Sequence, residues 1–92
     1  MAIVARRVKV LGRVQGVFFR AFTRDLASRA GVRGYVCNVA DGSVEAWLEG
    51  EEDGVAAVIE GLREGPPAAS VERVDVTGEV ATGRWGDFRI LR

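Results

Sequence analysis

Alternation of apolar and polar residues marks the strands most clearly. Residues 7–14 (RVKVLGRV) place Val8 and Val10 on one face, which predicts a β-strand. Residues 34–40 are rich in β-forming residues, and Asp41-Gly42 is a strong hairpin signal after them. Residues 43–49 then alternate strictly, and we expect Val44, Ala46 and Leu48 to face inward and Glu45, Trp47 and Glu49 outward.

Two other segments repeat apolar residues every three or four positions, a spacing typical of amphipathic helices. The first begins near residue 19 and ends at Gly31, which stands where a C-cap glycine belongs; its stripe is Phe19, Phe22, Leu26 and Ala30. The second starts with three acidic residues, which favour a helix N-terminus, and ends at Gly65-Pro66-Pro67; its stripe is Val55, Val58, Ile59 and Leu62.

Val74 and Val76 mark a fourth strand, and Phe88 and Ile90 mark a short fifth strand. The order is therefore βαββαβ plus a terminal strand. Two crossover units that share one hairpin predict a ferredoxin-like α+β sandwich. We expect an antiparallel sheet with both helices on one face, a short extra C-terminal strand, and the first strand beside the third.

Size and composition bound the class of protein. The 92 residues are 48% hydrophobic and 28% charged, which indicates a single folded domain over residues 1–92. Thirteen Lys and Arg residues balance thirteen Asp and Glu residues, so the formal net charge is zero. A balanced charge argues against a dedicated polyanion binder, and we expect no nucleic-acid partner.

The net charge is zero because the two halves of the chain carry opposite charges. Residues 1–33 carry eight basic residues against one acidic residue, and residues 34–92 carry five against twelve, so the halves hold charges of +7 and −7. Such a split indicates either an anion site or complementary surfaces that meet inside the fold. We expect cross-strand pairing to neutralise part of it, between the basic Arg7, Lys9 and Arg13 and the acidic Glu45 and Glu49.

The sequence lacks the residues that several kinds of chemistry require. The sequence has no histidine, so the usual proton shuttle near neutral pH and the commonest metal ligand are missing. The one cysteine, Cys37, excludes an intramolecular disulfide and a CxxC motif. No apolar run approaches the roughly 20 residues of a membrane span, and the N-terminus does not resemble a secretion signal. We expect a cytoplasmic protein without metal, cofactor or membrane partner.

The segment from Gly12 to Arg20 (GRVQGVFFR) is the most informative for chemistry. A strand leads into a glycine-bearing turn that opens directly into a helix, where backbone N–H groups converge readily on an anion. Gly16 allows positive φ, and Arg20 offers a planar guanidinium to a phosphate or carboxylate. Taken alone, the pattern leaves two interpretations open: an anion site, or a tight turn followed by a solvated arginine.

Two motifs give the chain a resemblance to the acylphosphatase family. The first is V-x-G-x-V-Q-G-V-x-F-R over residues 10–20, and the second is G-Y-V-x-N-x-x-D-G-x-V-E over residues 34–45. Gly65-Pro66-Pro67 before the fourth strand is similar to family members as well. The chain departs from the pattern at Cys37, where family members often carry a basic residue, and at Tyr35, where tryptophan is frequent.

The resemblance implies a small stand-alone enzyme that hydrolyses the carboxyl–phosphate bond of acyl phosphates to a carboxylate and inorganic phosphate. It implies catalytic roles for Arg20, which would bind phosphate, and Asn38, which would orient water. The phosphate-binding segment would comprise Gln15, Gly16, Val17, Phe18, Phe19 and Arg20. The expected partner is a small-molecule acyl phosphate, and we expect a monomer.

Two alternatives compete with this interpretation. A non-catalytic, regulatory domain of the same fold could bind an anion without turnover. An RNA-recognition module shares the strand order, but the segment that begins Arg33-Gly34-Tyr35 lacks the later aromatic residues and lies on the second strand. Among other residues, we expect Phe18 and Phe19 to serve packing, Cys37 to be a partly buried small hydrophobe, and Trp47 to be an exposed contact.

Overall fold

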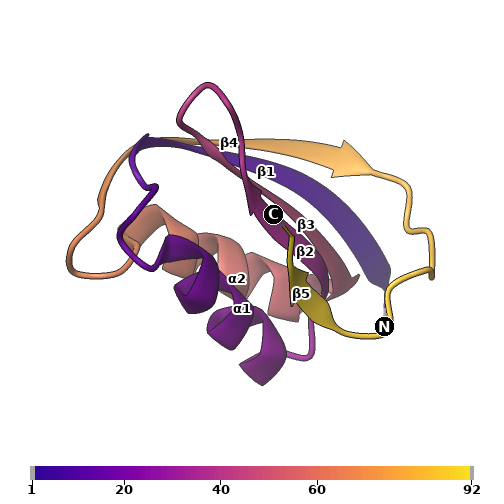
Figure 1. Cartoon of the computed structure of the whole chain (residues 1–92). Helices are drawn as coiled ribbons and strands as arrows, with labels where there is room; N and C mark the ends of the chain where they lie inside the picture. The colour runs from indigo at the N-terminus through magenta and orange to yellow at the C-terminus, as the bar shows by residue number, and fades with distance from the viewer. Residues whose placement is uncertain (1, 92) are drawn as a thin grey trace.

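The computed structural model describes residues 2–91, which form five strands and two helices in the predicted order (Figure 1). The elements are β1 (Ile3–Arg13), α1 (Phe19–Arg29), β2 (Arg33–Asn38), β3 (Val44–Glu51), α2 (Glu52–Glu64), β4 (Ser70–Glu79) and β5 (Phe88–Ile90). β1 begins four residues before the predicted strand. Neither helix of the described residues is long and apolar enough to cross a membrane.

The strands form one sheet in the order β4-β1-β3-β2-β5, and both helices pack on one of its faces (Figure 1). β1 pairs antiparallel with β3, which confirms the predicted neighbours of the ferredoxin-like α+β fold. Strands β1 to β4 form the predicted antiparallel sheet, and the extra C-terminal strand β5 adds to it parallel to β2. The chain reaches that orientation because residues 80–87 lead back from the end of β4 before β5 begins.

The core lies between the sheet and the helices. Val44, Ala46 and Leu48 of β3 are completely buried there, as their alternation predicts. Val8 and Val10 contribute the same face of β1. α2 adds its own predicted stripe to this core, with Val55, Val58 and Leu62 buried and Ile59 partly buried.

The buried stripe of α1 differs in part from the prediction. Phe19, Thr23 and Ala27 form its buried line, at spacings of four residues, whereas Phe22 and Leu26 flank it and are only partly buried. Burial of Thr23 is possible because its hydroxyl donates to the carbonyl oxygen of Phe19 at 2.9 Å. The polar Thr23 is one of the three buried positions, so the apolar pattern alone did not identify the whole line. Gly31 follows the helix with a φ of +70°, as expected of a C-cap glycine.

The opposite face of the sheet departs most from the sequence prediction. Trp47 and Glu49 alternate outward as expected, but they are only 8% and 2% exposed. The segment of residues 80–87 covers Glu49, while Trp47 donates its indole N–H to Glu49 and lies beneath the Arg7 guanidinium. Thr82 and Gly83 each donate a backbone N–H to the Glu49 carboxylate, at 3.0 and 2.6 Å. The prediction that these two residues face solvent is wrong, because a strand pattern cannot show that a distant loop covers the second face.

The prediction that the basic residues of β1 pair with Glu45 and Glu49 of β3 is also wrong. Arg7 pairs with Glu79 of β4 at 3.2 Å, and Lys9 pairs with Asp41 of the hairpin turn at 2.7 Å. Glu45 lies directly opposite Lys9 but accepts a hydrogen bond from the Tyr35 hydroxyl at 2.6 Å. The basic strand is thus matched by acidic residues on the edge strand and in a turn.

Candidate active site

The loop between β1 and α1 has an unusual backbone. The φ angle is +72° at Gly16, negative at Val17 and +61° at Phe18. Residues that alternate in this way turn successive backbone N–H groups toward a common point, which is the geometry of an anion-binding nest. Phe18 is the N-cap of α1 and provides no side-chain hydrogen bond to the first turn, which also contains no acidic residue. The first N–H groups of α1 therefore keep their capacity to bind an anion.

An open cavity of about 590 Å³ lies beside this loop. Ligand-binding cavities in proteins span roughly 300–1,000 Å³, so its size suits a small metabolite. The described residues that line it come from the loop, the first turn of α1, and the ends of β2 and β5: Val14, Gly16, Phe18, Phe19, Arg20, Ala21, Asn38 and Ile90. Its polar side chains are those of Arg20 and Asn38.

The topology explains how two residues 18 positions apart meet in one cavity. β1 and β2 both run antiparallel to β3, which lies between them, so they are parallel to each other. The loop after β1 and the last residue of β2, Asn38, consequently reach the same edge of the sheet. Asn38 shares a face with the buried Val36, and that face is the one on which α1 packs.

Five of the seven predicted site residues line the cavity, and two do not. Val17 is only 7% exposed and belongs to the core, so its side chain serves packing. Gln15 points away toward the β2–β3 turn. Its amide nitrogen donates to the carbonyl oxygens of Val39 and Ser43, at 2.7 and 2.9 Å.

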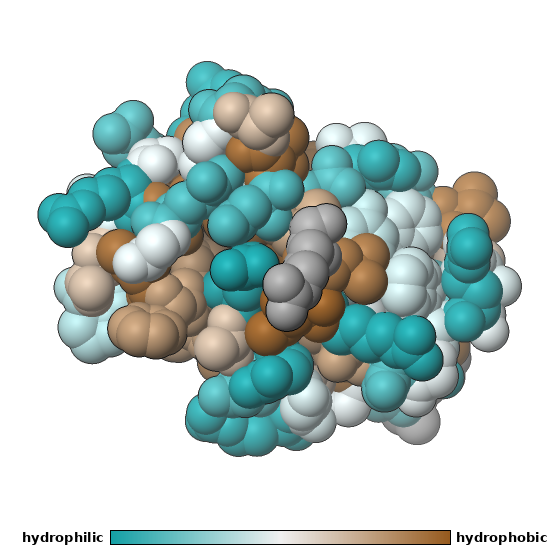
Figure 2. All heavy atoms as spheres, in the orientation of Figure 1, coloured by the Kyte–Doolittle hydropathy of each residue, from teal (hydrophilic) through white to brown (hydrophobic). Residues whose placement is uncertain are grey.

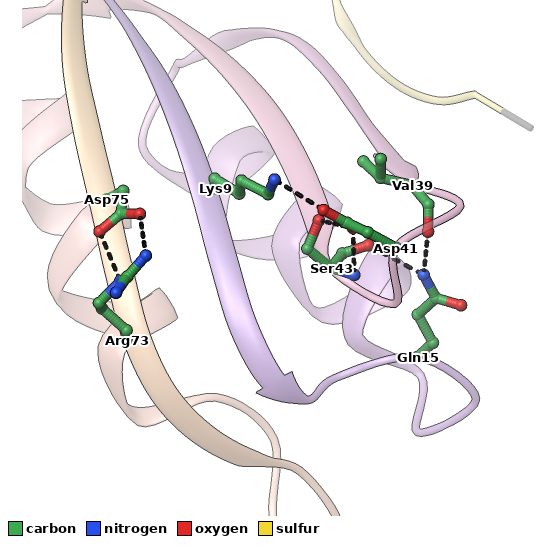
Figure 3. A network of polar contacts seen from close by, with 7 residues as sticks. All are labelled: Lys9, Gln15, Val39, Asp41, Ser43, Arg73 and Asp75. Atoms are coloured by element: carbon green, nitrogen blue, oxygen red, sulfur yellow. Dashed lines mark hydrogen bonds and ion pairs between the residues drawn. The ribbon is translucent and has the colours of Figure 1, made fainter.

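A polar network fixes that turn against the loop, and Figure 3 shows its members. Asp41 accepts hydrogen bonds from the backbone N–H and the hydroxyl of Ser43 and is paired with Lys9. Lys9, followed by Ser43, holds the pKa of Asp41 well below its usual range. Because Gln15 joins the same turn to the loop, the network fixes the end of β2, where Asn38 lies, relative to the residues that follow β1. The sequence motif contains Gln15 but does not show this contact.

Three apolar lining residues have no counterpart among the predicted site residues. Val14 and Ala21 flank the predicted phosphate-binding segment of residues 15–20, and Ile90 comes from β5 at the other end of the chain. Ile90 reaches the cavity because β5 pairs parallel to β2. The sequence of a short strand does not show which edge of the sheet it will join. No local pattern therefore identifies Ile90 as a residue of the cavity.

Other expectations about individual residues have mixed outcomes. Phe19 is 1% exposed, which confirms its role in packing, but Phe18 is 83% exposed and packs little. Cys37 lies on the opposite face of β2 from Asn38 and is half-buried, as predicted. Burial and the nearby Glu45 carboxylate raise the pKa of its thiol, which keeps it protonated at neutral pH. No cluster of three or more potential metal ligands occurs within residues 2–91.

Comparison with known proteins identifies the family. The acylphosphatase family model matches residues 6–90. The chain belongs to the acylphosphatase family. It is 51% identical to an acylphosphatase of Pyrobaculum islandicum over 92 residues, which cover 99% of this chain and 97% of that protein. A Chloroflexus aurantiacus acylphosphatase is 48% identical, with 99% of both chains covered.

Solved structures of the family share the fold closely. An acylphosphatase from Coxiella burnetii superposes with a TM-score of 0.92 at 38% identity, over 97% of this chain and 93% of that chain. Acylphosphatases are enzymes that hydrolyse acyl phosphates, and this chain is a member of that enzyme class. Membership decides against the RNA-recognition module and against the non-catalytic alternative.

Proposed function

We propose that the cavity beside the β1–α1 loop is the active site, where Arg20 and the loop N–H groups hold the phosphoryl group and Asn38 orients the attacking water. One observation carries this proposal. Arg20 and Asn38, the two polar side chains that line the cavity, come from separate elements and meet next to a loop whose φ angles alternate in sign. A tight turn with a solvated arginine would need neither Asn38 nor the cavity.

Arg20 suits the role of a phosphate ligand by its chemistry and its position. A guanidinium presents paired N–H donors that match two phosphoryl oxygens. Arg20 is the second residue of α1 and half-buried, so the helix N-terminus adds its partial positive charge beside it. Within residues 2–91, Arg20 forms no ion pair that would compete with a substrate for its guanidinium.

Asn38 suits the positioning of water. A neutral amide does not act as a base near neutral pH, but it donates and accepts hydrogen bonds and so orients a water molecule. The water oxygen forms a bond to phosphorus while the bond from phosphorus to the acyl oxygen breaks, and the electron pair leaves with the carboxylate. A phosphoryl oxygen takes the proton of the water. The carboxylate is a good leaving group, so positioning and charge stabilisation suffice for the reaction.

The test is turnover of acetyl phosphate by the wild type and by two variants. Arg20→Ala should lower kcat/KM by about 10³-fold or more and weaken competitive inhibition by inorganic phosphate, because both depend on the guanidinium. Asn38→Ala should lower kcat by about 10²-fold and leave phosphate inhibition nearly unchanged, because the amide contacts water rather than the phosphoryl group.

Arg24→Ala is the matched control. Arg24 lies one turn farther along α1, is exposed, and forms an ion pair only with its neighbour Asp25 among the described residues. Its substitution should change kcat/KM by less than about twofold. Near-normal kcat/KM in Arg20→Ala would show that the phosphoryl group is bound elsewhere.

A further inference from the structure

Phe18 is an exposed aromatic residue that the fold itself does not explain. It is 83% exposed, so its ring contributes little to the core, unlike the neighbouring ring of Phe19 at 1%. It also holds a left-handed conformation, φ +61° and ψ +23°, which a side chain with a Cβ atom rarely adopts. A glycine or asparagine would serve the backbone at this position at lower conformational cost.

The location of Phe18 indicates what the ring contacts. Five large apolar side chains of the described residues are exposed: Ile3, Phe18, Val76, Val80 and Leu91. Of these, Phe18 lines the cavity, where it joins the side chains of Val14, Ala21 and Ile90. Figure 2 shows brown apolar surface beside teal hydrophilic surface in the part of the molecule where Figure 1 places the start of α1. Polar and apolar groups thus adjoin at this site.

The cavity is larger than a phosphoryl group requires. Its volume of about 590 Å³ corresponds to roughly 20 water molecules at ~30 Å³ each. A phosphoryl group bound by Arg20 and the loop N–H groups would fill a small part of it. The acyl group of the substrate would extend from there toward the apolar lining side chains of Val14, Phe18, Ala21 and Ile90.

We propose that Phe18, together with Ile90, binds the acyl group and makes the enzyme selective for acyl phosphates with an apolar chain or ring over acetyl phosphate. This inference rests on the proposed function, since it places the phosphoryl group at Arg20. The contact with the acyl chain is equal in the ground state and the transition state. Selectivity therefore acts through KM, with little change in kcat.

The experiment compares acetyl, butanoyl and hexanoyl phosphates, whose carboxylate leaving groups differ little in basicity. For the wild type, kcat/KM should rise by about tenfold from acetyl to hexanoyl phosphate, mainly through a lower KM. In Phe18→Ser the ratio should fall to about twofold, and in Phe18→Leu, which keeps an apolar side chain, it should stay above that of Phe18→Ser.

Val80→Ser is the matched control, because Val80 is 84% exposed but does not line the cavity. Its substitution should leave the chain-length ratio at the wild-type value. A wild-type ratio near one, or a ratio in Phe18→Ser equal to that of the wild type, would overturn the inference and leave the proposed function intact. Turnover of none of the three substrates by the wild type would instead overturn the proposed function.

Discussion

Two regions of the molecule gather backbone N–H groups, and they differ in whether the protein itself supplies an anion to them. On the outer face of the sheet, the protein supplies the anion itself: the Glu49 carboxylate accepts hydrogen bonds from Thr82, Gly83 and the Trp47 indole N–H. At the β1–α1 loop, no acidic residue stands in the first turn of α1. The donors there are left for a ligand.

The difference shows how similar hydrogen-bonding chemistry serves structure in one place and binding in another. Burial would raise the pKa of Glu49, but the hydrogen bonds from Trp47, Gly83 and Thr82 outweigh it and hold the pKa below its usual value. The carboxylate is therefore charged, 2% exposed and fully satisfied. Arg20, in contrast, is half-buried at an open cavity, where a substrate can complete its hydrogen bonds.

The two regions are also far apart. Glu49 lies opposite Ala5 on β1, whereas the loop follows Arg13 at the other end of that strand. Eight residues of strand separate Ala5 from Arg13, which is roughly 26 Å at ~3.3 Å per residue. Substitutions at one end should consequently leave the other end largely unchanged, and this expectation can be tested.

The largest effect should come from Glu49→Ala. The substitution removes the acceptor of several buried donors and releases residues 80–87, so the free energy of unfolding should fall by about 2–4 kcal/mol. Urea unfolding measures this loss. Inhibition of the folded variant by inorganic phosphate should stay within about twofold of the wild type, because the loop proposed to bind phosphate lies at the other end of β1.

Glu49→Gln is the control for shape. It keeps one oxygen acceptor but directs an NH₂ group at donors, so its loss of stability should lie between those of the wild type and Glu49→Ala. An unfolding free energy of Glu49→Ala within about 0.5 kcal/mol of the wild type would show that the carboxylate does not hold residues 80–87 in place.

A smaller effect is expected from Gly16→Ala. An added Cβ at Gly16 meets no atom within 4 Å, so the substitution acts only through the φ angle of +72°. The left-handed conformation should cost about 1–2 kcal/mol of unfolding free energy, or else the loop should relax and phosphate inhibition weaken. Gly86→Ala is the matched control, because Gly86 also has open space but no positive φ. Equal effects of the two substitutions would contradict a strained loop.

The smallest effect should be the pH dependence of the rate. The sequence has no histidine, and neither a guanidinium nor an amide changes protonation near neutral pH, so kcat/KM should vary by less than about threefold between pH 6 and 8. A step near pH 6.5 would indicate a different proton acceptor.

Stability should respond to pH where the rate does not. The pKa of Glu49 is lower in the folded state than in the unfolded chain, so its contribution is complete above the unfolded pKa of about 4.3 and is lost progressively as the pH falls from there through the lower folded pKa. Urea unfolding at pH 7 and pH 4 should show a smaller difference for Glu49→Gln than for the wild type. If the unfolding free energy changed equally between pH 7 and pH 4 in the wild type and in Glu49→Gln, the charge of Glu49 would not be what holds residues 80–87.

The sequence predicted most of the fold because apolar periodicity reports burial against a single layer. Val44, Ala46 and Leu48 alternate toward the helices, and α2 buries Val55, Val58 and Leu62. The same periodicity mispredicted burial where a loop covers the second face of the sheet, and where a polar side chain is satisfied by a hydrogen bond within its own helix. Glu49 became buried under residues 80–87, and Thr23 entered the core because its hydroxyl donates to the backbone of its own helix.

Some residues of the candidate site could be predicted from the sequence, and others could not. Arg20 and Asn38 could be named because the two motifs that contain them resemble the acylphosphatase family, whereas the glycine turn alone left an anion site and a solvated arginine both open. Ile90 could not, because it reaches the cavity only through the parallel pairing of β5 with β2. The exposure of Phe18 was likewise hidden, since two adjacent phenylalanines look alike until the helix begins between them.

The order of the elements, the inward-packing faces of β1, β3 and α2, and the short motifs that carry the polar site residues follow from the sequence alone. These are local properties, set by side-chain periodicity and turn chemistry. Only the tertiary structure decided that residues 80–87 cover Glu49, that Gln15 binds the β2–β3 turn, and that the cavity has an apolar wall. Each of these depends on which distant segments meet, and that is set by the packing of the whole chain.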